Sequence, residues 1–170
     1  MASAIASRKC NDRGLEHDQR RHGADVAALS GTHTELLERT VLDRTIDPGE
    51  RAVARRTTHR DDFYFQGHFP GDPIVPAIIL VEMLAQTGGL AAGAPKADQP
   101  QVAIALRVAG LGPFKFPAAA RPGDRLEAHA RVVGQMGGLY KIEGSVTADG
   151  RAVAAGSVTL ARVGAASPFA

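Results

Sequence analysis

A continuous apolar segment, running from Pro76 to about Leu90, constrains the fold of this chain more than any other feature of its sequence. Proline is favoured in the first turn of a helix, and the residues that follow it here are apolar on nearly every helical face. Such a helix is predicted to be buried on all sides. The rest of the chain must therefore wrap around it.

The segments on either side of this helix have β character. Upstream, short apolar alternation between residues 35 and 58 surrounds Asp47-Pro48-Gly49 and predicts a hairpin. Downstream, turn signals rich in glycine separate four segments of β-compatible residues, which are Val102–Val108, Arg125–Gly134, Leu139–Ala148 and Arg151–Arg162. One buried helix with five to six antiparallel strands, and no alternation of strands with helices, predicts an α+β fold in which a curved sheet wraps the helix.

The length of the chain bounds the number of domains. A chain of 170 residues can bury one core and is too short for two ordinary domains. Residues 1–33 are polar, charged and without helical or strand periodicity, so we expect a disordered N-terminal extension. The domain is predicted to span residues 34–163, and residues 164–170 are predicted to form a C-terminal tail.

Composition argues against several classes of function. No apolar run reaches the length of a membrane span, and the N-terminus lacks the apolar core of a secretory signal, so we expect a cytoplasmic protein. The single cysteine, Cys10, has no partner for a disulfide or for a metal site of the usual spacing. Basic residues are scattered among acidic ones, the net charge is only +2 and aromatic residues make up 5%, which disfavours nucleic acid as a partner. We therefore expect no metal, no membrane and no nucleic acid.

Glu82 stands inside the apolar helix, where a carboxylate needs a reason. It is either a structural glutamate at a solvent-facing crack or a general acid, because burial would raise the pKa of its carboxyl group and keep it protonated near neutral pH. Gln86 follows four residues later on the same helical face. It is close enough to hydrogen-bond and orient Glu82, although an ordinary surface glutamine has the same spacing.

His68 lies directly before the helix, in a loop dense in glycine and proline, Gln66–Pro73. Catalytic groups are common on loops held by a rigid scaffold, and histidine exchanges protons near neutral pH. An exposed or capping histidine is the alternative. The remaining histidines are weaker candidates, because they lie in the predicted extension or beside charged residues in strand-like segments: His17, His22, His33, His59 and His129.

The whole segment from Phe65 to Gln86, FQGHFPGDPIVPAIILVEMLAQ, closely resembles the signature of the 3-hydroxyacyl-acyl carrier protein dehydratases, the FabZ- and FabA-like enzymes. His68 and Glu82 are 14 positions apart (82 minus 68), as in that family. The resemblance extends more loosely from about Leu36 to Val163. It implies the hot dog fold, which agrees with the wrapped sheet predicted above. It also implies a homodimer, with higher oligomers as an option, in which each active site takes its histidine from one chain and its acid from the other.

The resemblance further implies a reaction, the loss of water from a (3R)-3-hydroxyacyl group on acyl carrier protein to give the trans-2-enoyl product, without a cofactor. His68 suits the base that takes the C2 proton, and protonated Glu82 suits the acid for the departing hydroxyl. The backbone N–H of Ala77, in the first helical turn, suits the donor to the thioester oxygen. Ala77 replaces the glycine usual in the family, which adds a methyl group there, and the family's upstream Pro-His-Arg segment has no match in Ser30–Arg39.

Other residues have two interpretations each. Phe69 and Val75, with Phe63 and Ile74, line an acyl tunnel or belong to the plain core. Three basic residues either dock the acidic carrier protein or form an ordinary solvated strand edge: Lys115, Arg121 and Arg125.

Three other functions remain as alternatives. A dehydratase that also shifts the double bond is disfavoured by Glu82, because similar isomerases place aspartate there, whereas Gly71-Asp72-Pro73 slightly favours it. A non-catalytic acyl-carrier-binding subunit of a heterodimer would not need both His68 and Glu82. A thioesterase on the same fold would need an activated water that attacks the carbonyl.

Overall fold

The computed structural model describes residues 43–95 and 104–163. The predicted extension (1–33), Cys10 and the predicted tail (164–170) lie outside the described residues. The described part contains a sheet, one α-helix and a short 3₁₀ helix, in the order β1 (Asp43–Asp47), β2 (Arg51–Thr57), η2 (Phe63–Phe65), α2 (Ala77–Gly93), β3 (Leu106–Lys115), β4 (Arg125–Met136), β5 (Leu139–Ala148) and β6 (Arg151–Arg162).

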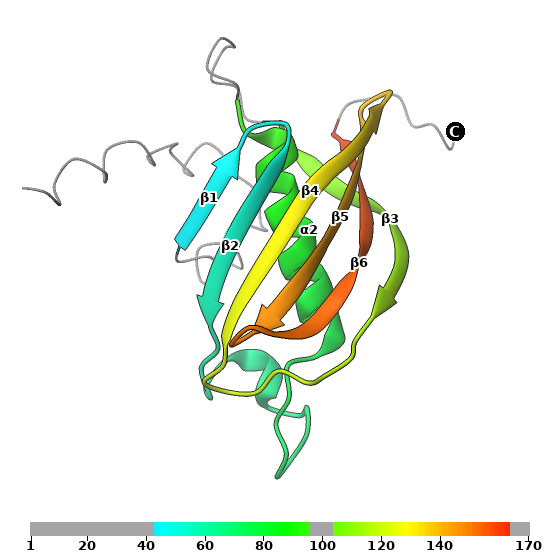
Figure 1. The fold of residues 1–170 in the computed structure, drawn as a ribbon. Coiled ribbons are helices and arrows are strands. Elements are labelled where there is room, and N and C mark those ends of the chain that lie inside the picture. The colour runs from blue at the N-terminus through cyan, green and yellow to red at the C-terminus, as the bar shows by residue number, and fades with distance from the viewer. Residues whose placement is uncertain (1–42, 96–103, 164–170) are drawn as a thin grey trace, which may run out of the picture.

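The six strands form one antiparallel sheet in the order β1-β2-β4-β5-β6-β3. Its hairpins are β1–β2, β4–β5 and β5–β6, each at a turn that the sequence marks with glycine. Asp149 and Gly150, between β5 and β6, have φ angles of 48° and 81°, which fit the Asp-Gly hairpin signal. The sheet curves around α2, which lies along one of its faces (Figure 1). The predicted α+β architecture, a hot dog fold, is confirmed.

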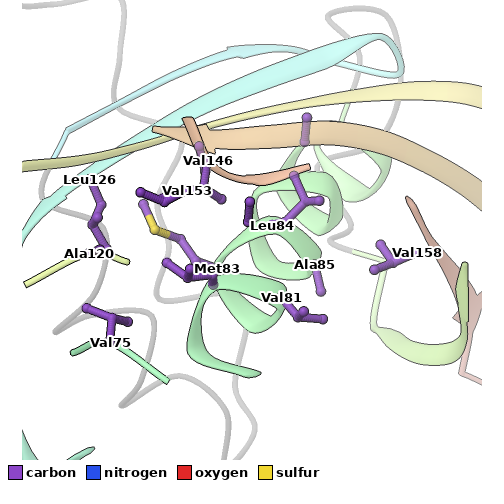
Figure 2. Close-up of a cluster of buried hydrophobic side chains, with 14 of the residues drawn as sticks. Val75, Val81, Met83, Leu84, Ala85, Ala120, Leu126, Val146, Val153 and Val158 are labelled. Atoms are coloured by element: carbon purple, nitrogen blue, oxygen red, sulfur yellow. The ribbon is translucent and has the colours of Figure 1, made fainter. Parts of the chain in front are cut away.

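The core lies between α2 and the concave face of the sheet. Met83 and Leu84 of α2 are almost completely buried. They pack among sheet residues that are buried to the same degree, including Leu126, Val146 and Val153 (Figure 2). Each fully buried aliphatic side chain contributes about 1.5–3 kcal/mol relative to an exposed one, so this layer fixes the position of α2 on the sheet.

The helix approaches the sheet closely because glycines face each other's elements. A Cβ atom on Gly144 of β5 would lie 2.6 Å from Cδ1 of Leu84 and would also strike the backbone carbonyl of His129. A Cβ atom on Gly88 of α2 would lie 2.6 Å from Cγ2 of Ile142. The two glycines predicted to weaken the helix near its end are therefore inside it, and α2 continues to Gly93.

The prediction that α2 is buried on all sides is wrong for the single chain. Ile78 is 63% exposed, and Glu82 and Gln86 are half-buried. The sheet covers only one face of the helix, and apolar composition does not reveal what covers the other. The uncovered face is the one that carries the carboxylate.

The strand after the helix is also displaced from its predicted position. It was expected at Val102–Val108, whereas β3 spans Leu106–Lys115 and includes Pro113. Within the described residues β3 pairs with β6 alone, so it is an edge strand. A proline is tolerated at a sheet edge, because its missing N–H has no partner strand to serve.

We predict that Gly144→Ala lowers the free energy of unfolding by about 1–3 kcal/mol, because the new methyl group overpacks the helix–sheet contact. Gly134→Ala is the matched control in the same hairpin, since its Cβ atom would meet only Cβ of Lys141, at 3.9 Å. That control should change the stability by less than about 0.5 kcal/mol. Urea denaturation of both variants measures the difference, and equal stability of the two would contradict this account of the packing.

Candidate functional site

The loop that carries His68 joins η2 to α2 and is closed by its own backbone hydrogen bonds. The backbone N–H of Ile74 donates to the carbonyl of His68 at 2.9 Å. Phe69 and Asp72 exchange two longer backbone hydrogen bonds, at 3.4 and 3.2 Å. The loop therefore returns on itself and presents His68 beside the start of α2.

A second loop, between β3 and β4, holds this one from outside. The backbone N–H of Val75 donates to the carbonyl of Ala120 at 2.8 Å, and Arg121 forms an ion pair with Asp72. A hydrogen bond and the charge of the Arg121 guanidinium lower the pKa of the Asp72 carboxyl group. Both side chains are exposed, so the ion pair itself adds little stability.

His68 is half-buried, and its ring stacks on Phe69 with 4.2 Å between ring centroids. Its Nδ1 atom is buried and has no hydrogen-bond partner within the described residues. Nearly all buried polar atoms in folded proteins are paired, so an unpaired one calls for an explanation. A ring nitrogen left free in this way is available to a molecule that enters the site.

Glu82 lies on the uncovered face of α2. Its Oε1 atom accepts a hydrogen bond from Nε2 of Gln86 at 2.9 Å, which is the contact that the spacing predicts. The expectation that Glu82 is deeply buried is wrong, because the sheet lies on the opposite side of the helix. Oε1 of Gln86 is buried without a partner in the described part of the chain. This face thus carries an oriented carboxyl group and a second polar atom that needs a partner.

Ala77 is the first residue of α2 and is exposed, with Pro76 at the N-cap position. The N–H groups of a first helical turn lack partners within the helix and lie at the positive end of its dipole. The amide of Ala77 is therefore accessible as a donor to an oxygen atom. Its methyl group is equally accessible at the same place.

The other predicted site residues divide between surface and core. Phe69 is 52% exposed, as is fitting for a group that meets a ligand or another chain. Val75 is a buried member of the main core cluster, which its alternative interpretation describes, and its place in an acyl tunnel stays a prediction. Lys115 and Arg125 are exposed, and Arg121 is the ion-pair partner of Asp72.

His68 and Glu82 are not joined to each other in this chain. No hydrogen bond or ion pair connects them anywhere in residues 43–95 and 104–163. The same residues contain no group of three histidine, cysteine, aspartate or glutamate side chains that could hold a metal ion. Nor does any helix among them have the length and apolarity needed to cross a membrane.

Sequence reasoning missed a buried polar cluster that precedes the loop: Arg56, Asp62 and Tyr64. A signal was present, because Arg56 occupies an inward position in the alternation of β2, where Ala52 and Ala54 are buried. An arginine at an inward strand position requires a buried partner.

The comparison with known proteins agrees with this geometry. A family model described as a FabA-like domain matches residues 31–157. A protein of Roseiflexus castenholzii named 3-hydroxyacyl-acyl-carrier-protein dehydratase FabZ is 35% identical over 136 residues, which are 80% of this chain and 92% of that protein. One of the same name from Oleidesulfovibrio alaskensis is 30% identical over 147 residues, 85% of this chain and 95% of that protein.

A solved structure shows the same fold at lower identity. The E. coli PaaI protein from the phenylacetic acid degradation operon is 18% identical, with a TM-score of 0.53 over 70% of this chain and 76% of that one. Taken with the match over most of the chain to proteins named FabZ, the chain belongs to the FabA-like family of hot dog proteins, which includes the 3-hydroxyacyl-acyl carrier protein dehydratases.

Proposed function

We propose that this protein is a hydro-lyase that converts (3R)-3-hydroxyacyl-acyl carrier protein to trans-2-enoyl-acyl carrier protein in fatty-acid or related acyl-chain biosynthesis. The observation that carries the proposal is the pairing of a loop histidine that has a free buried nitrogen with a helix glutamate oriented by Gln86. The family of the chain supports the same reaction, because its relatives are named for it. The reaction needs no metal or redox cofactor from this set of residues.

The proposed mechanism uses three groups. His68 takes a proton from C2 of the acyl group, and the electron pair of that C–H bond moves toward the thioester carbonyl. The backbone N–H of Ala77 donates to the carbonyl oxygen as it gains negative charge. Glu82, with its proton in place, protonates the C3 hydroxyl, so that the C–O bond breaks and water leaves. A proton passes back from His68 to Glu82, directly or through solvent, to restore both groups.

Gln86 is proposed to act through Glu82 without touching the acyl group. Its Nε2–H bond holds one carboxyl oxygen, which leaves the other oxygen free to carry the proton. Phe69 and Val75 are proposed to lie along the acyl chain. The Ala77 methyl group stands near the thioester in this arrangement and is expected to restrict which acyl groups fit.

We further propose that the site is completed by a second copy of the chain. Three large apolar side chains near the site are strongly exposed in the single chain: Phe63 at 62%, Phe69 at 52% and Ile78 at 63%. Such a group of exposed apolar residues is typical of an interface. The free edge of β3 and the uncovered face of α2 offer further surface to a partner. A homodimer, or a higher oligomer built from it, would bring His68 of one chain to Glu82 of the other.

Acyl carrier protein is the proposed macromolecular substrate, with Lys115 and Arg125 as exposed basic residues available to it. The cytoplasmic location expected from the sequence stays a prediction. Double-bond isomerisation remains the second candidate function. In this structure Asp72, from the segment that favours it, forms an ion pair with Arg121.

We predict that the wild-type protein removes one water from 3-hydroxybutyryl-acyl carrier protein. His68→Ala and Glu82→Gln should each lower kcat by about a hundredfold or more, because each removes one proton-transfer group. Mass spectrometry of the carrier-bound product measures the loss of water, and circular dichroism checks that the variants are folded.

Other products of the same assay would contradict simple dehydration. Substrate that binds but stays intact would indicate a non-catalytic subunit, and a released free acid would indicate a thioesterase. A product whose double bond has moved away from the thioester would indicate the bifunctional alternative.

We predict that mixed dimers regain activity if the site is shared between chains. Co-expression of His68→Ala and Glu82→Gln chains with two different tags allows the mixed dimer to be purified. It holds one intact site of two and should show about half of the wild-type activity, whereas either variant alone remains inactive. A mixed dimer as inactive as its parents would show that each site uses both residues of one chain.

A further inference from the structure

The segment between β2 and the catalytic loop contains a buried charged cluster, consisting of Arg56, Asp62 and Tyr64. In Figure 1 this segment lies at the end of the molecule where β2 leads into η2 and α2. Arg56 of β2 forms an ion pair with Asp62, and the two side chains are only 9% and 12% exposed. Tyr64 donates its hydroxyl proton to Oδ2 of Asp62 at 2.7 Å. The guanidinium of Arg56 also lies 5.8 Å from the centre of the Tyr64 ring.

The Asp62 carboxylate is the centre of this cluster. Besides Arg56 and Tyr64, the backbone N–H of His59 donates to Oδ2 of Asp62 at 2.9 Å. One carboxylate therefore joins the end of β2, the turn after it and the 3₁₀ helix η2. Hydrophobic residues of similar size are often at least as stabilising as a buried ion pair, so the presence of one here is not explained by stability alone.

The cluster is connected to His68 through η2. The backbone N–H of Phe65 donates to the carbonyl of Asp62 at 3.0 Å, and the backbone N–H of His68 donates to the carbonyl of Phe65 at 3.4 Å. The Tyr64 and Phe65 rings are both buried, and their centroids are 4.6 Å apart. The position of the Asp62 carboxylate thus sets the position of η2, and η2 sets where the His68 backbone begins its loop.

We infer that the Arg56–Asp62–Tyr64 cluster positions His68, holding the loop so that the imidazole reaches the acyl group in one orientation. These are positioning residues, because none of the three side chains contacts His68 itself. The inference rests on the base role proposed above for His68. A shift of the base by a small fraction of its reach to C2 is costly, since a misplacement of about 1 Å lowers a rate about a hundredfold.

The Tyr64 hydroxyl offers a measurement of the cluster that does not depend on activity. Burial, and after it the hydrogen bond to Asp62, raises the pKa of this hydroxyl, while the charge of Arg56 opposes the shift. A raised pKa favours the neutral phenol in the folded state. The stability that it contributes is complete below the ordinary tyrosine pKa of 10.0 and is lost as the pH rises through the folded-state pKa.

We therefore predict that Tyr64 titrates later than an ordinary tyrosine. The chain has two tyrosines, so Tyr140→Phe leaves Tyr64 as the single phenol to follow by ultraviolet absorbance. Its ionisation in the folded protein should fall above pH 10.0, and Asp62→Asn should bring it down toward that value. Ionisation at the ordinary value in a protein that circular dichroism shows to be folded would contradict the hydrogen bond.

The decisive experiment compares Tyr64→Phe with Tyr140→Phe, a matched change at the other tyrosine. Tyr140 is also buried, but it lies in β5 and its hydroxyl meets Gln135 at 3.4 Å. We expect Tyr64→Phe to lower kcat about tenfold to a hundredfold with KM within about twofold, and Tyr140→Phe to leave both unchanged. In a His68→Ala background, Tyr64→Phe should lower the residual rate no further, because it acts through His68.

Two results would overturn the inference. One is a kcat of Tyr64→Phe that equals the wild-type value. The other is an equal loss from Tyr64→Phe whether or not His68 is present. Amide hydrogen exchange of residues 65–69 gives an independent readout, which should accelerate in Tyr64→Phe and not in Tyr140→Phe. If the wild type fails to dehydrate the thioester, the proposed function falls, while unchanged exchange in Tyr64→Phe would overturn the positioning role separately.

Discussion

The packing of α2 into the curve of the sheet is the contact on which the rest of the structure depends. Met83 and Leu84 are buried against β4, β5 and β6, and glycines at positions 88 and 144 allow the helix and sheet to approach closely. Because a helix presents its residues at a fixed angular spacing, burying this face determines the direction of the opposite one. Glu82 and Gln86 are therefore held in place by residues that take no part in chemistry.

The same packing leaves the single chain incomplete. The face of α2 that carries Glu82 is uncovered, and His68 stands on a loop beside the start of the helix without a partner for its buried nitrogen. Exposed aromatic and aliphatic side chains surround this region, and a sheet edge remains free at β3. A second copy of the chain would explain all of these features together, since it supplies both the missing cover and the missing residue.

Much of the fold followed from local patterns in the sequence. Strands β5 and β6 and the turns before them were predicted with their bounds, because alternation and Asp-Gly or Gly-Gly signals are local. The Gln86–Glu82 hydrogen bond followed from helical spacing. The position of β3 did not, because a proline at an edge strand is tolerated only by virtue of where that strand lies. The exposure of α2 and the Arg56–Asp62 pair also depend on distant packing, which no local pattern records.

The central claim is that the active site forms between two chains, with His68 from one and Glu82 from the other. A crystal structure of the assembled protein tests it most directly, because it shows which residues line each cavity. The account predicts that the imidazole of His68 faces the Glu82 carboxyl group of the partner subunit across one apolar cleft, with the Ala77 amide at its wall. An assembly in which His68 and the partner's Glu82 open separately to solvent would contradict it.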